Sequence, residues 1–339
     1  MSERKLASIQ KIREIKPIKD ADNIEIVRIN NWDVVSKKGE FKVGDLCIYF
    51  QIDSFLPIRD EFEFLRKSSY KKMLDVEGFR LKTMRMRGQL SQGLVMPLSI
   101  LGDFGWTAYE GLDITEKLGI IKYEPPIPAE LNGEVKGGFP SFIPKTDEER
   151  IQNLTDKFEE WKEQGILFSE TEKLDGTSAT FYFNNDEFGI CGRNWEYLEA
   201  EGNTFFRVAR ELQLEEKFRS FDENLAIQGE LIGEGIQGNP YKIKGQTIRV
   251  FNVFDIDNHR RLTPDETTGV LSRIFNLNQV PVINTEFTLP DTIDELLQHV
   301  EGKSVLNPQT NREGSVFRSL DGKISFKVIS NTFLLKNEK

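Results

Sequence analysis

A lysine in the pattern Lys-x-Asp-Gly is the feature of this chain with the clearest chemical potential. Lys173, Asp175 and Gly176 form the pattern, and Glu172 stands directly before the lysine. A lysine attacks as a nucleophile only as the neutral amine, and its usual pKa is about 10.4, so a site must favour loss of the proton. Desolvation or a nearby cation has that effect. The Asp-Gly pair predicts a tight turn at the end of a strand, which would hold the amine at the mouth of a pocket.

The same tetrapeptide can also be a plain surface turn, and chance produces it in roughly one chain in ten of this length. Further charged side chains favour the chemical interpretation. Arg193 follows an apolar segment, Glu230 lies within one, Glu313 precedes one and Lys327 lies in another. A charge in an apolar run needs a partner, although each of these taken singly could be a sheet-rim charge or half of a structural ion pair.

The composition is that of a globular protein whose chemistry does not depend on histidine. Of the 339 residues, 38% are hydrophobic and 29% charged, which allows two domains of ordinary size. The two histidines, His259 and His299, argue against a His-based metal site or a His-dependent triad. The net charge of −10 argues against a protein that coats nucleic acid without specificity, but it allows a local basic face.

The sequence also predicts where the protein resides. No apolar run approaches the length of a membrane span, and the first ten residues lack the apolar stretch of a signal peptide. Cys47 and Cys191 lie in apolar strand-like segments, where buried free thiols are expected rather than a disulfide. We expect an intracellular, cytoplasmic protein without membrane contact, and a monomer.

Residues 1–125 are predicted to form a small barrel, because short β-type runs alternate there with turn signals. The expected strands are Leu6–Ile15, Ile24–Ile29, Trp32–Ser36, Leu46–Phe50, Phe79–Met86 and Gly93–Pro97, with a helical or irregular close over Asp103–Leu118. The opening resembles the OB-fold modules that bind tRNA. This part therefore predicts an OB-like nucleic-acid-binding domain.

A basic stretch in this part consists of Arg80, Lys82, Arg85 and Arg87. On one strand, the first two would share a face and the last two would share the other. The stretch predicts either phosphate-backbone contacts or an edge strand that charge protects from pairing.

A linker is expected over residues 126–145, where prolines and glycines are frequent. Residues 146–339 predict an α+β domain built on antiparallel sheet. Its expected strands are Ile166–Glu170, Ser178–Phe183, Phe188–Gly192, Leu225–Ile232, Ile248–Ile256, Gly314–Arg318 and Ile324–Val328. Its expected helices are Asp147–Gln164, Asn203–Lys217, Asp265–Asn276 and Thr292–Glu301.

Five motifs stand in the order K-x-D-G, G-E-L-x-G, F-x-x-F-D-I, E-G-x-V and F-K-V-I. The series resembles that of the covalent nucleotidyltransferases, which are ATP-dependent DNA and RNA ligases and mRNA capping enzymes. It covers roughly residues 139–328. The few residues after Lys327 can build neither the OB domain nor the helical domain that other branches place there, and the barrel-like part stands in front instead. With Gly44-Asp45-Leu46 and the stretch Phe139–Glu148, the chain resembles the Deinococcus/Naegleria-type ATP-dependent RNA ligases nearly end to end.

This resemblance implies ATP as the nucleotide, an AMP bound covalently to Lys173, and Mg²⁺ or Mn²⁺ as the metal. It implies catalytic roles for Lys173, Lys327 and Asp175. The nucleotide contacts expected are Lys173, Glu172, Gly176, Arg193, Glu230, Phe254 and Lys327. Phe254 is the first choice to stack on adenine and Phe251 the second. Asp175, Glu230 and Glu313 are the expected metal-side carboxylates, directly or through water, because Mg²⁺ dehydrates reluctantly.

The expected reaction joins an RNA 3′-hydroxyl to a 5′-phosphate, with RNA or an RNA/DNA nicked duplex as the partner. The alternatives are a capping-type guanylyltransferase, an ATP-dependent DNA ligase and a non-enzymatic OB-type RNA-binding protein. One position departs from the pattern. Many relatives carry two lysines one residue apart in the last motif, and Ser325 stands here in place of the first. Lys323 would share a strand face with Lys327 and could partly replace the missing lysine.

Overall fold

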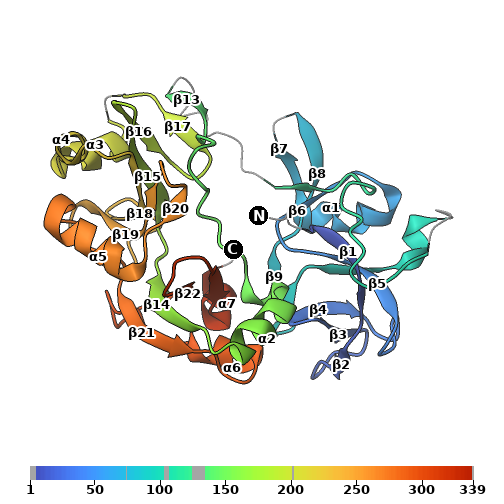
Figure 1. Cartoon of the computed structure of the whole chain (residues 1–339). Helices are drawn as coiled ribbons and strands as arrows, with labels where there is room; N and C mark the ends of the chain where they lie inside the picture. The colour runs from blue at the N-terminus through green and yellow to red at the C-terminus, as the bar shows by residue number, and fades with distance from the viewer. Residues whose placement is uncertain (1–4, 74, 103–106, 124–133, 201, 338–339) are drawn as a thin grey trace. The chain divides into compact units, whose positions relative to one another are not determined.

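A computed structural model describes residues 5–73, 75–102, 107–123, 134–200 and 202–337 (Figure 1). The chain divides into two compact units, the first of residues 1–127 with 334–339 and the second of residues 128–333. Each unit is described by itself. Among the described residues, no helix is both long enough and apolar enough to cross a membrane.

The first unit is built from short antiparallel strands, as the sequence predicts. They are β1 (Ala7–Lys11), β2 (Glu14–Pro17), β3 (Ile24–Ile29), β4 (Trp32–Lys37), β5 (Leu46–Phe50), β6 (Ser54–Pro57), β7 (Tyr70–Met73), β8 (Val76–Arg80), β9 (Thr83–Met86), β10 (Gln89–Gln92), β11 (Leu94–Pro97) and β12 (Ile121–Lys122), with short helices η1 (Asp60–Leu65), α1 (Arg66–Ser69) and η2 (Leu98–Leu101). The sheets have the orders β1-β5-β11, β2-β3-β4, β12-β6-β8-β7 and β10-β9. Strand β5 buries both faces, because Ile48 and Phe50 enter one apolar cluster while Cys47 and Tyr49 enter another.

The basic stretch of this unit is not one strand. Arg80 ends β8, Arg85 lies on β9, and Arg87 occupies the turn to β10 with φ of +50°. Arg80 lies 3.6 Å from Asp53 and its guanidinium stacks 4.5 Å from the ring centre of Tyr123. Arg80 therefore has a structural role in the unit, while Arg85 and Arg87 are exposed on the β9–β10 hairpin.

The second unit contains two sheets whose strand ladders are all antiparallel. A seven-stranded sheet has the order β13 (Val135–Gly138), β17 (Trp195–Tyr197), β16 (Glu187–Cys191), β15 (Thr177–Asn184), β18 (Leu225–Gly233), β19 (Gln246–Asp255) and β20 (Arg260–Arg261). A four-stranded sheet has the order β21 (Val282–Thr288), β14 (Leu167–Lys173), β22 (Gly314–Ser319) and β23 (Ser325–Ile329). Separate helices and antiparallel sheets confirm the expected α+β class.

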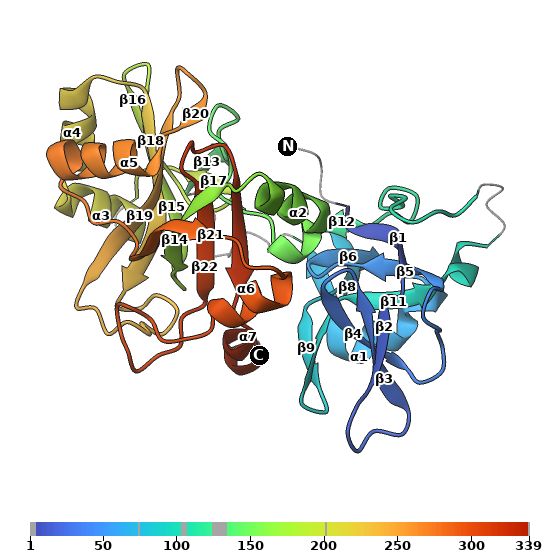
Figure 2. The same ribbon diagram turned by 60° about the horizontal axis from the view of Figure 1, so that its bottom comes forward.

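Helices cover one side of each sheet (Figure 2). Helices α3 (Thr204–Glu211), α4 (Leu214–Phe221) and α5 (Pro264–Val270), with the π turn η5 (Leu271–Phe275), share an apolar cluster with the seven-stranded sheet. Helices α2 (Thr155–Glu163) and α6 (Ile293–His299), with the turn η4 (Ile151–Asn153), share another with the four-stranded sheet. A last helix, α7, spans Asn331–Asn337. The opposite face of the seven-stranded sheet carries the polar residues considered below.

Two expected helices differ from the structure. The helix predicted from Asp147 begins only at Thr155, because residues 147–150 are extended beside β23, where the N–H of Lys327 donates to the carbonyl of Glu149 at 2.9 Å. The helix predicted over Asn203–Lys217 is broken into α3 and α4, because Gln213 adopts a left-handed conformation with φ of 54°.

The expected linker also differs in part. Residues 126–133 lie outside the described residues, but Val135–Gly138 forms β13 and pairs with β17. Residues 134–145 are therefore part of the second unit rather than a free connection. Both cysteines are buried and unpaired, which confirms that prediction.

Candidate active site

Lys173 ends β14, and its amine lies 2.7 Å from Oε1 of Glu313. Strand β22 pairs with β14 so that Gly314 stands opposite Lys173, which brings the preceding Glu313 to the amine. Burial alone would lower the pKa of the Lys173 amine, but Glu313 and Glu230 outweigh burial and hold this pKa above its usual value. With these neighbours the lysine is an ammonium ion, so it needs a further change before it can act as a nucleophile.

The Asp-Gly pair forms the turn that the sequence predicts, between β14 and β15. The N–H of Asp175 donates to the hydroxyl of Tyr241 at 2.5 Å, which fixes the turn from outside. Gly176 lies so close to β18 that a Cβ atom there would stand 2.4 Å from the carbonyl oxygen of Leu231 and 2.8 Å from the side chain of Glu230. Only glycine permits this approach, which sets Glu230 beside Lys173.

Three carboxylates crowd this turn. Burial raises the pKa of Asp175 to about 6 and that of Glu230 to about 7, and the charge of Glu313 adds to both shifts. Carboxyl groups with raised pKa values lack enough positive charge nearby, which is the condition that a divalent cation would relieve. The donor set therefore fits a hard cation such as Mg²⁺ or Mn²⁺.

The role of these three carboxylates as metal-side groups, directly or through water, stays a prediction. Within the described part of the chain, no group of three or more His, Cys, Asp or Glu side chains is arranged to hold a metal ion. Contact through water molecules, one of the two modes expected from the sequence, does not need such an arrangement.

Lys327 lies on the same sheet face as Lys173, two strands away. It stands opposite Val316 of β22, and Val316 stands opposite Thr171 of β14. Burial lowers the pKa of the Lys327 amine, and Asp147, 3.0 Å away, offsets only part of that effect. Asp147 also lies 3.4 Å from the guanidinium of Arg193, so one carboxylate joins both predicted cations.

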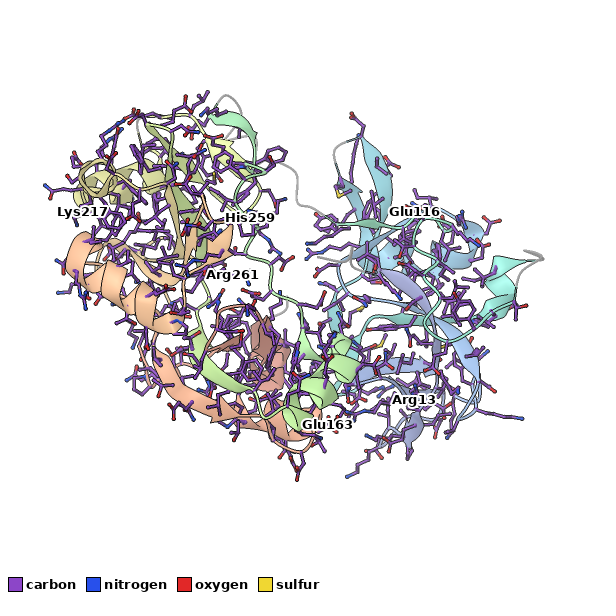
Figure 3. The ribbon with its side chains drawn as sticks, viewed as in Figure 1. Arg13, Glu116, Glu163, Lys217, His259 and Arg261 are labelled. Atoms are coloured by element: carbon purple, nitrogen blue, oxygen red, sulfur yellow. The ribbon has the colours of Figure 1, made fainter. Side chains whose placement is uncertain are left out.

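Lys323 does not replace the missing lysine of the last motif. Strand β23 begins only at Ser325, and Lys323 lies in the preceding turn with its side chain 81% exposed and 3.3 Å from Asp321. Ser325 accepts instead from the guanidinium of Arg261 at 2.7 Å. Arg261 is labelled in Figure 3. The cation nearest to this position therefore comes from β20.

Two predicted nucleotide contacts lie away from this cluster. Glu172 alternates with Lys173 and is buried on the other face of β14, where Oε2 accepts from the N–H of Val305 at 2.8 Å. Its side chain cannot reach a nucleotide beside Lys173, and only its backbone could. Phe254 is 3% exposed in an apolar cluster with Tyr182, and its ring meets that of His259 edge to face.

Phe251, the second choice for adenine, lies in a different environment. It occupies an irregularity in the pairing of β18 with β19, packs beside Leu174 of the Lys-x-Asp-Gly turn and stays partly exposed. The guanidinium of Arg318 lies 5.7 Å from the ring centre and donates to the Phe251 carbonyl at 2.8 Å. Phe251 is thus the aromatic ring next to the reactive turn.

Arg318 belongs to a buried cluster that sequence reasoning missed. Its guanidinium also donates to Oε1 of Glu148 at 3.0 Å, and Glu148 accepts from the hydroxyl of Ser325. Arg318 and Glu148 each expose only 11% of the side chain. The charges of Arg318 and Arg261 keep the pKa of Glu148 below its usual value against the effect of burial. This cluster ties β22, β19 and β23 to the segment that carries Asp147.

The structure thus brings together Lys173, Asp175, Gly176, Glu230 and Glu313, with Lys327 and Arg193 joined at Asp147. Sequence reasoning missed Tyr241, Asp147, Glu148 and Arg318 as members of the site. No local pattern distinguishes them from ordinary turn or surface residues. The one available signal was that Arg318 lies on an apolar strand, where a charge needs a partner.

Comparisons with known proteins agree with this fold. A family of OB-fold domains matches residues 6–98, and the RNA ligase family matches residues 167–329. A search of the curated proteins found no match. Among solved structures, a Naegleria gruberi RNA ligase mutant with AMP and Mn is 44% identical, with 98% of this chain and 99% of that chain covered and a TM-score of 0.88. Naegleria gruberi RNA ligase with PPi is 44% identical over 99% of each chain, with a TM-score of 0.87.

These findings define first the class of protein, an OB-fold domain followed by a ligase domain. They also confirm the expected OB-like character of the first unit. With this identity over nearly the whole length of both chains, the protein belongs to the RNA ligase family.

Proposed function

We propose that this protein is an ATP-dependent RNA ligase that joins a 3′-hydroxyl to a 5′-phosphate, at nicks in duplexes, through an AMP bound covalently to Lys173. The observation that carries the proposal is a half-buried lysine at the end of β14 whose amine lies among three carboxylates. Solved relatives carry AMP or ATP with Mn, which supports an adenine nucleotide and a divalent metal here.

In the first step, Nζ of Lys173 forms a bond to the α-phosphorus of ATP as the bond to pyrophosphate breaks. The amine must first lose a proton, and Oε1 of Glu313, at 2.7 Å, is placed to accept it. A divalent cation bound near Asp175, Glu230 and Glu313 would supply positive charge that offsets the carboxylates and favours the neutral amine. Phosphoryl transfer depends mainly on positioning and on neutralisation of charge.

The other residues hold the nucleotide. Lys327 would contact the α-phosphate. Arg193, which Asp147 joins to Lys327, would contact the ribose or a phosphate. We assign adenine stacking to Phe251 in preference to Phe254, because Phe251 is partly exposed beside the reactive turn. AMP then passes from Lys173 to the 5′-phosphate of the RNA, and attack by the 3′-hydroxyl on that activated phosphate releases AMP.

The test is incubation with ATP or GTP labelled at the α-phosphate, followed by a denaturing gel. We expect label from ATP on the wild-type chain and none on Lys173→Met. Label from GTP would indicate a capping-type guanylyltransferase, and no label would indicate a non-enzymatic RNA-binding protein. Nicked duplexes with an RNA or a DNA 3′-hydroxyl strand then separate an RNA ligase from a DNA ligase. A cytoplasmic, monomeric protein is part of the same proposal, and sedimentation tests the monomer.

A further inference from the structure

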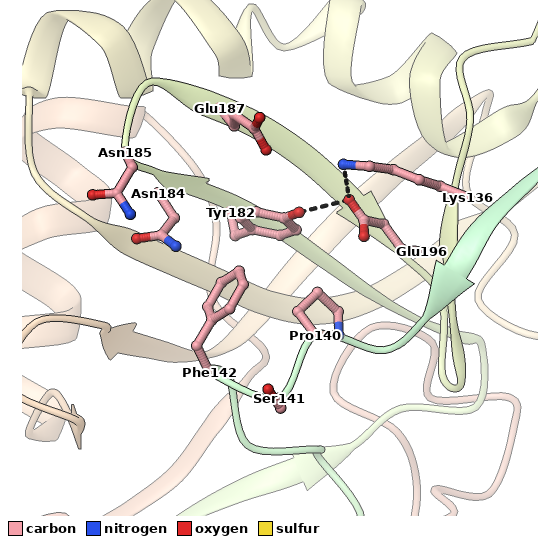
Figure 4. Close-up of a pocket in the computed structure, with 9 residues that line it drawn as sticks. All are labelled: Lys136, Pro140, Ser141, Phe142, Tyr182, Asn184, Asn185, Glu187 and Glu196. Atoms are coloured by element: carbon pink, nitrogen blue, oxygen red, sulfur yellow. Dashed lines mark hydrogen bonds and ion pairs between the residues drawn. The ribbon is translucent and has the colours of Figure 1, made fainter.

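The face of the seven-stranded sheet that carries Glu230 is covered differently at its two ends. Toward the far end of β15, a cavity of about 550 Å³ stays open (Figure 4). Lys136, the one cation among the residues that line it, lies 2.8 Å from Oε1 of Glu196, which also accepts from the Tyr182 hydroxyl at 2.6 Å. This open end therefore gives a substrate phosphate no free positive charge.

The end of the face beside Lys173 is covered by two segments, which we call the covering segments. Residues 236–245 join β18 to β19, and residues 304–309 precede β22. Tyr241 of the first and Leu306 of the second pack in one apolar cluster with Leu174 of the Lys-x-Asp-Gly turn. Both segments thus lie directly against the turn that follows the nucleophile.

Each covering segment holds one side of the nucleophile. The N–H of Val305, in the second segment, donates at 2.8 Å to the carboxylate of Glu172, the residue before the lysine. The hydroxyl of Tyr241, in the first segment, accepts at 2.5 Å from the N–H of Asp175, two residues after the lysine. The backbone around Lys173 is therefore anchored on both sides.

Asn307 joins the two covering segments to each other. Its side-chain amide donates to the carbonyl of Pro240 at 2.7 Å, and its side-chain oxygen accepts from the N–H of Gln309 at 3.1 Å. The residue is only 9% exposed, so water does not readily replace these bonds. Because Pro240 directly precedes Tyr241, the bond to its carbonyl sets the position of the tyrosine hydroxyl. Asn307 thereby completes a ring of contacts around the lysine.

This ring bears on the direction of the Lys173 amine rather than on the binding of ATP. Its hydrogen bonds reach the residues on either side of the lysine and do not involve the amine itself. Attack on the α-phosphorus requires the amine to lie in line with the bond that breaks, and a misplacement of about 1 Å can cost about 100-fold in rate. A weakened ring should therefore slow the attack without changing the affinity for ATP.

We propose that Asn307 is a positioning residue for the attack of Lys173 on ATP, acting through Pro240 and Tyr241 on the Lys-x-Asp-Gly turn. The proposal rests on the proposed function and extends it to a residue outside the carboxylate cluster. Lys173 forms its bond to phosphorus only in the first step. When the 3′-hydroxyl attacks the activated 5′-phosphate, the lysine forms and breaks no bond, so this last step should depend much less on Asn307.

The variants are Asn307→Ala and Asn307→Asp, each with a matched control. Asn307→Asp keeps the shape of the side chain and the oxygen that accepts from Gln309, and it removes only the donated bond. It is the second variant that keeps the test valid if Asn307→Ala lowers the melting temperature. The control for Asn307→Ala is Asn311→Ala, four residues further on. The control for Asn307→Asp is Gln309→Glu, which adds the same charge and keeps an oxygen for the amine of Lys242.

Two rates are measured for each folded variant. Single-turnover labelling over a range of ATP concentrations gives the maximal rate of the first step and the half-saturating concentration of ATP. Sealing of a nicked duplex whose 5′-phosphate already carries AMP, at saturating enzyme, gives the rate of the last step. A residue that only stabilises the fold would affect both steps equally through the folded fraction, so the comparison separates positioning from stability.

We expect both Asn307 variants to label about 10- to 100-fold more slowly at saturating ATP, with the half-saturating concentration within about twofold of the wild type. Sealing of the pre-adenylylated nick should stay within about threefold, and both controls should match the wild type in both steps. Wild-type labelling by Asn307→Asp, an equal loss in both steps, or a raised half-saturating concentration with an unchanged maximal rate would each overturn the positioning role. Failure of the wild type to take label from ATP would instead overturn the proposed function.

Discussion

The carboxylate of Glu230 should destabilise the free protein at neutral and higher pH. Its pKa is raised from 4.5 to about 7, chiefly by burial, with the amine of Lys173 offsetting only part of the effect. A carboxyl group with a raised folded-state pKa costs stability wherever the unfolded chain would be ionised and the folded chain resists ionisation. The amide of Gln has nearly the same shape and no charge, so Glu230→Gln should remove this cost.

The magnitude follows from the shift. One pKa unit corresponds to about 1.4 kcal/mol. The raised pKa of Glu230 therefore sets an upper limit of roughly 3 kcal/mol on the stability that the ionised carboxylate costs. Because the side chain is only partly buried, we expect Glu230→Gln to stabilise the free protein by about 2 kcal/mol above pH 8. The gain should diminish as the pH falls from about 7 and should vanish near pH 4.5, where the carboxyl group is protonated in both states.

The measurement is urea unfolding at several pH values between 5 and 8.5, without nucleotide or metal, with Glu234→Gln as the control. Glu234 follows the same strand and is exposed, so its change should have little effect at any pH. Equal stability of Glu230→Gln and the wild type at pH 8.5, or a gain that grows toward low pH, would refute the reasoning. The variant should also lose covalent labelling with ATP, which separates the stabilising effect from the chemical role.

Three further outcomes are expected. Tyr241→Phe should leave the N–H of Asp175 without its partner, so it should lower the stability in urea unfolding by about 1–3 kcal/mol and slow covalent labelling with ATP. Unchanged stability and labelling would mean that the turn does not depend on this hydrogen bond. Arg318→Met should cost about 3–5 kcal/mol because Glu148 loses its closest buried cation, whereas Arg219→Met, an exposed helix pair, should cost under about 1 kcal/mol. Changing Arg85 and Arg87 together to Gln should flatten the salt dependence of nicked-duplex binding by about one unit of log-log slope per lost phosphate contact, and an unchanged slope would mean that they only protect a hairpin.

Local sequence was sufficient for the parts of this protein that local chemistry specifies. The alternation of apolar residues placed the strands around Lys173, Glu230 and Lys327, because a strand with a buried face has a period of two. The Lys-x-Asp-Gly turn could be predicted because Gly176 meets a backbone restriction that no other residue satisfies. The order of five motifs then predicted the family.

Tertiary contacts decided what no local pattern encodes. Periodicity extended a helix back to Asp147, but this segment pairs with β23, where the carbonyl of Glu149 accepts from the N–H of Lys327. The protonated state of Lys173 depends on Glu313, a residue 140 positions away in the chain, because electrostatic coupling depends on distance in space. The choice of Phe251 over Phe254 depends likewise on tertiary packing, because Phe254 is buried in an apolar cluster with Tyr182 whereas Phe251 stays partly exposed beside Leu174.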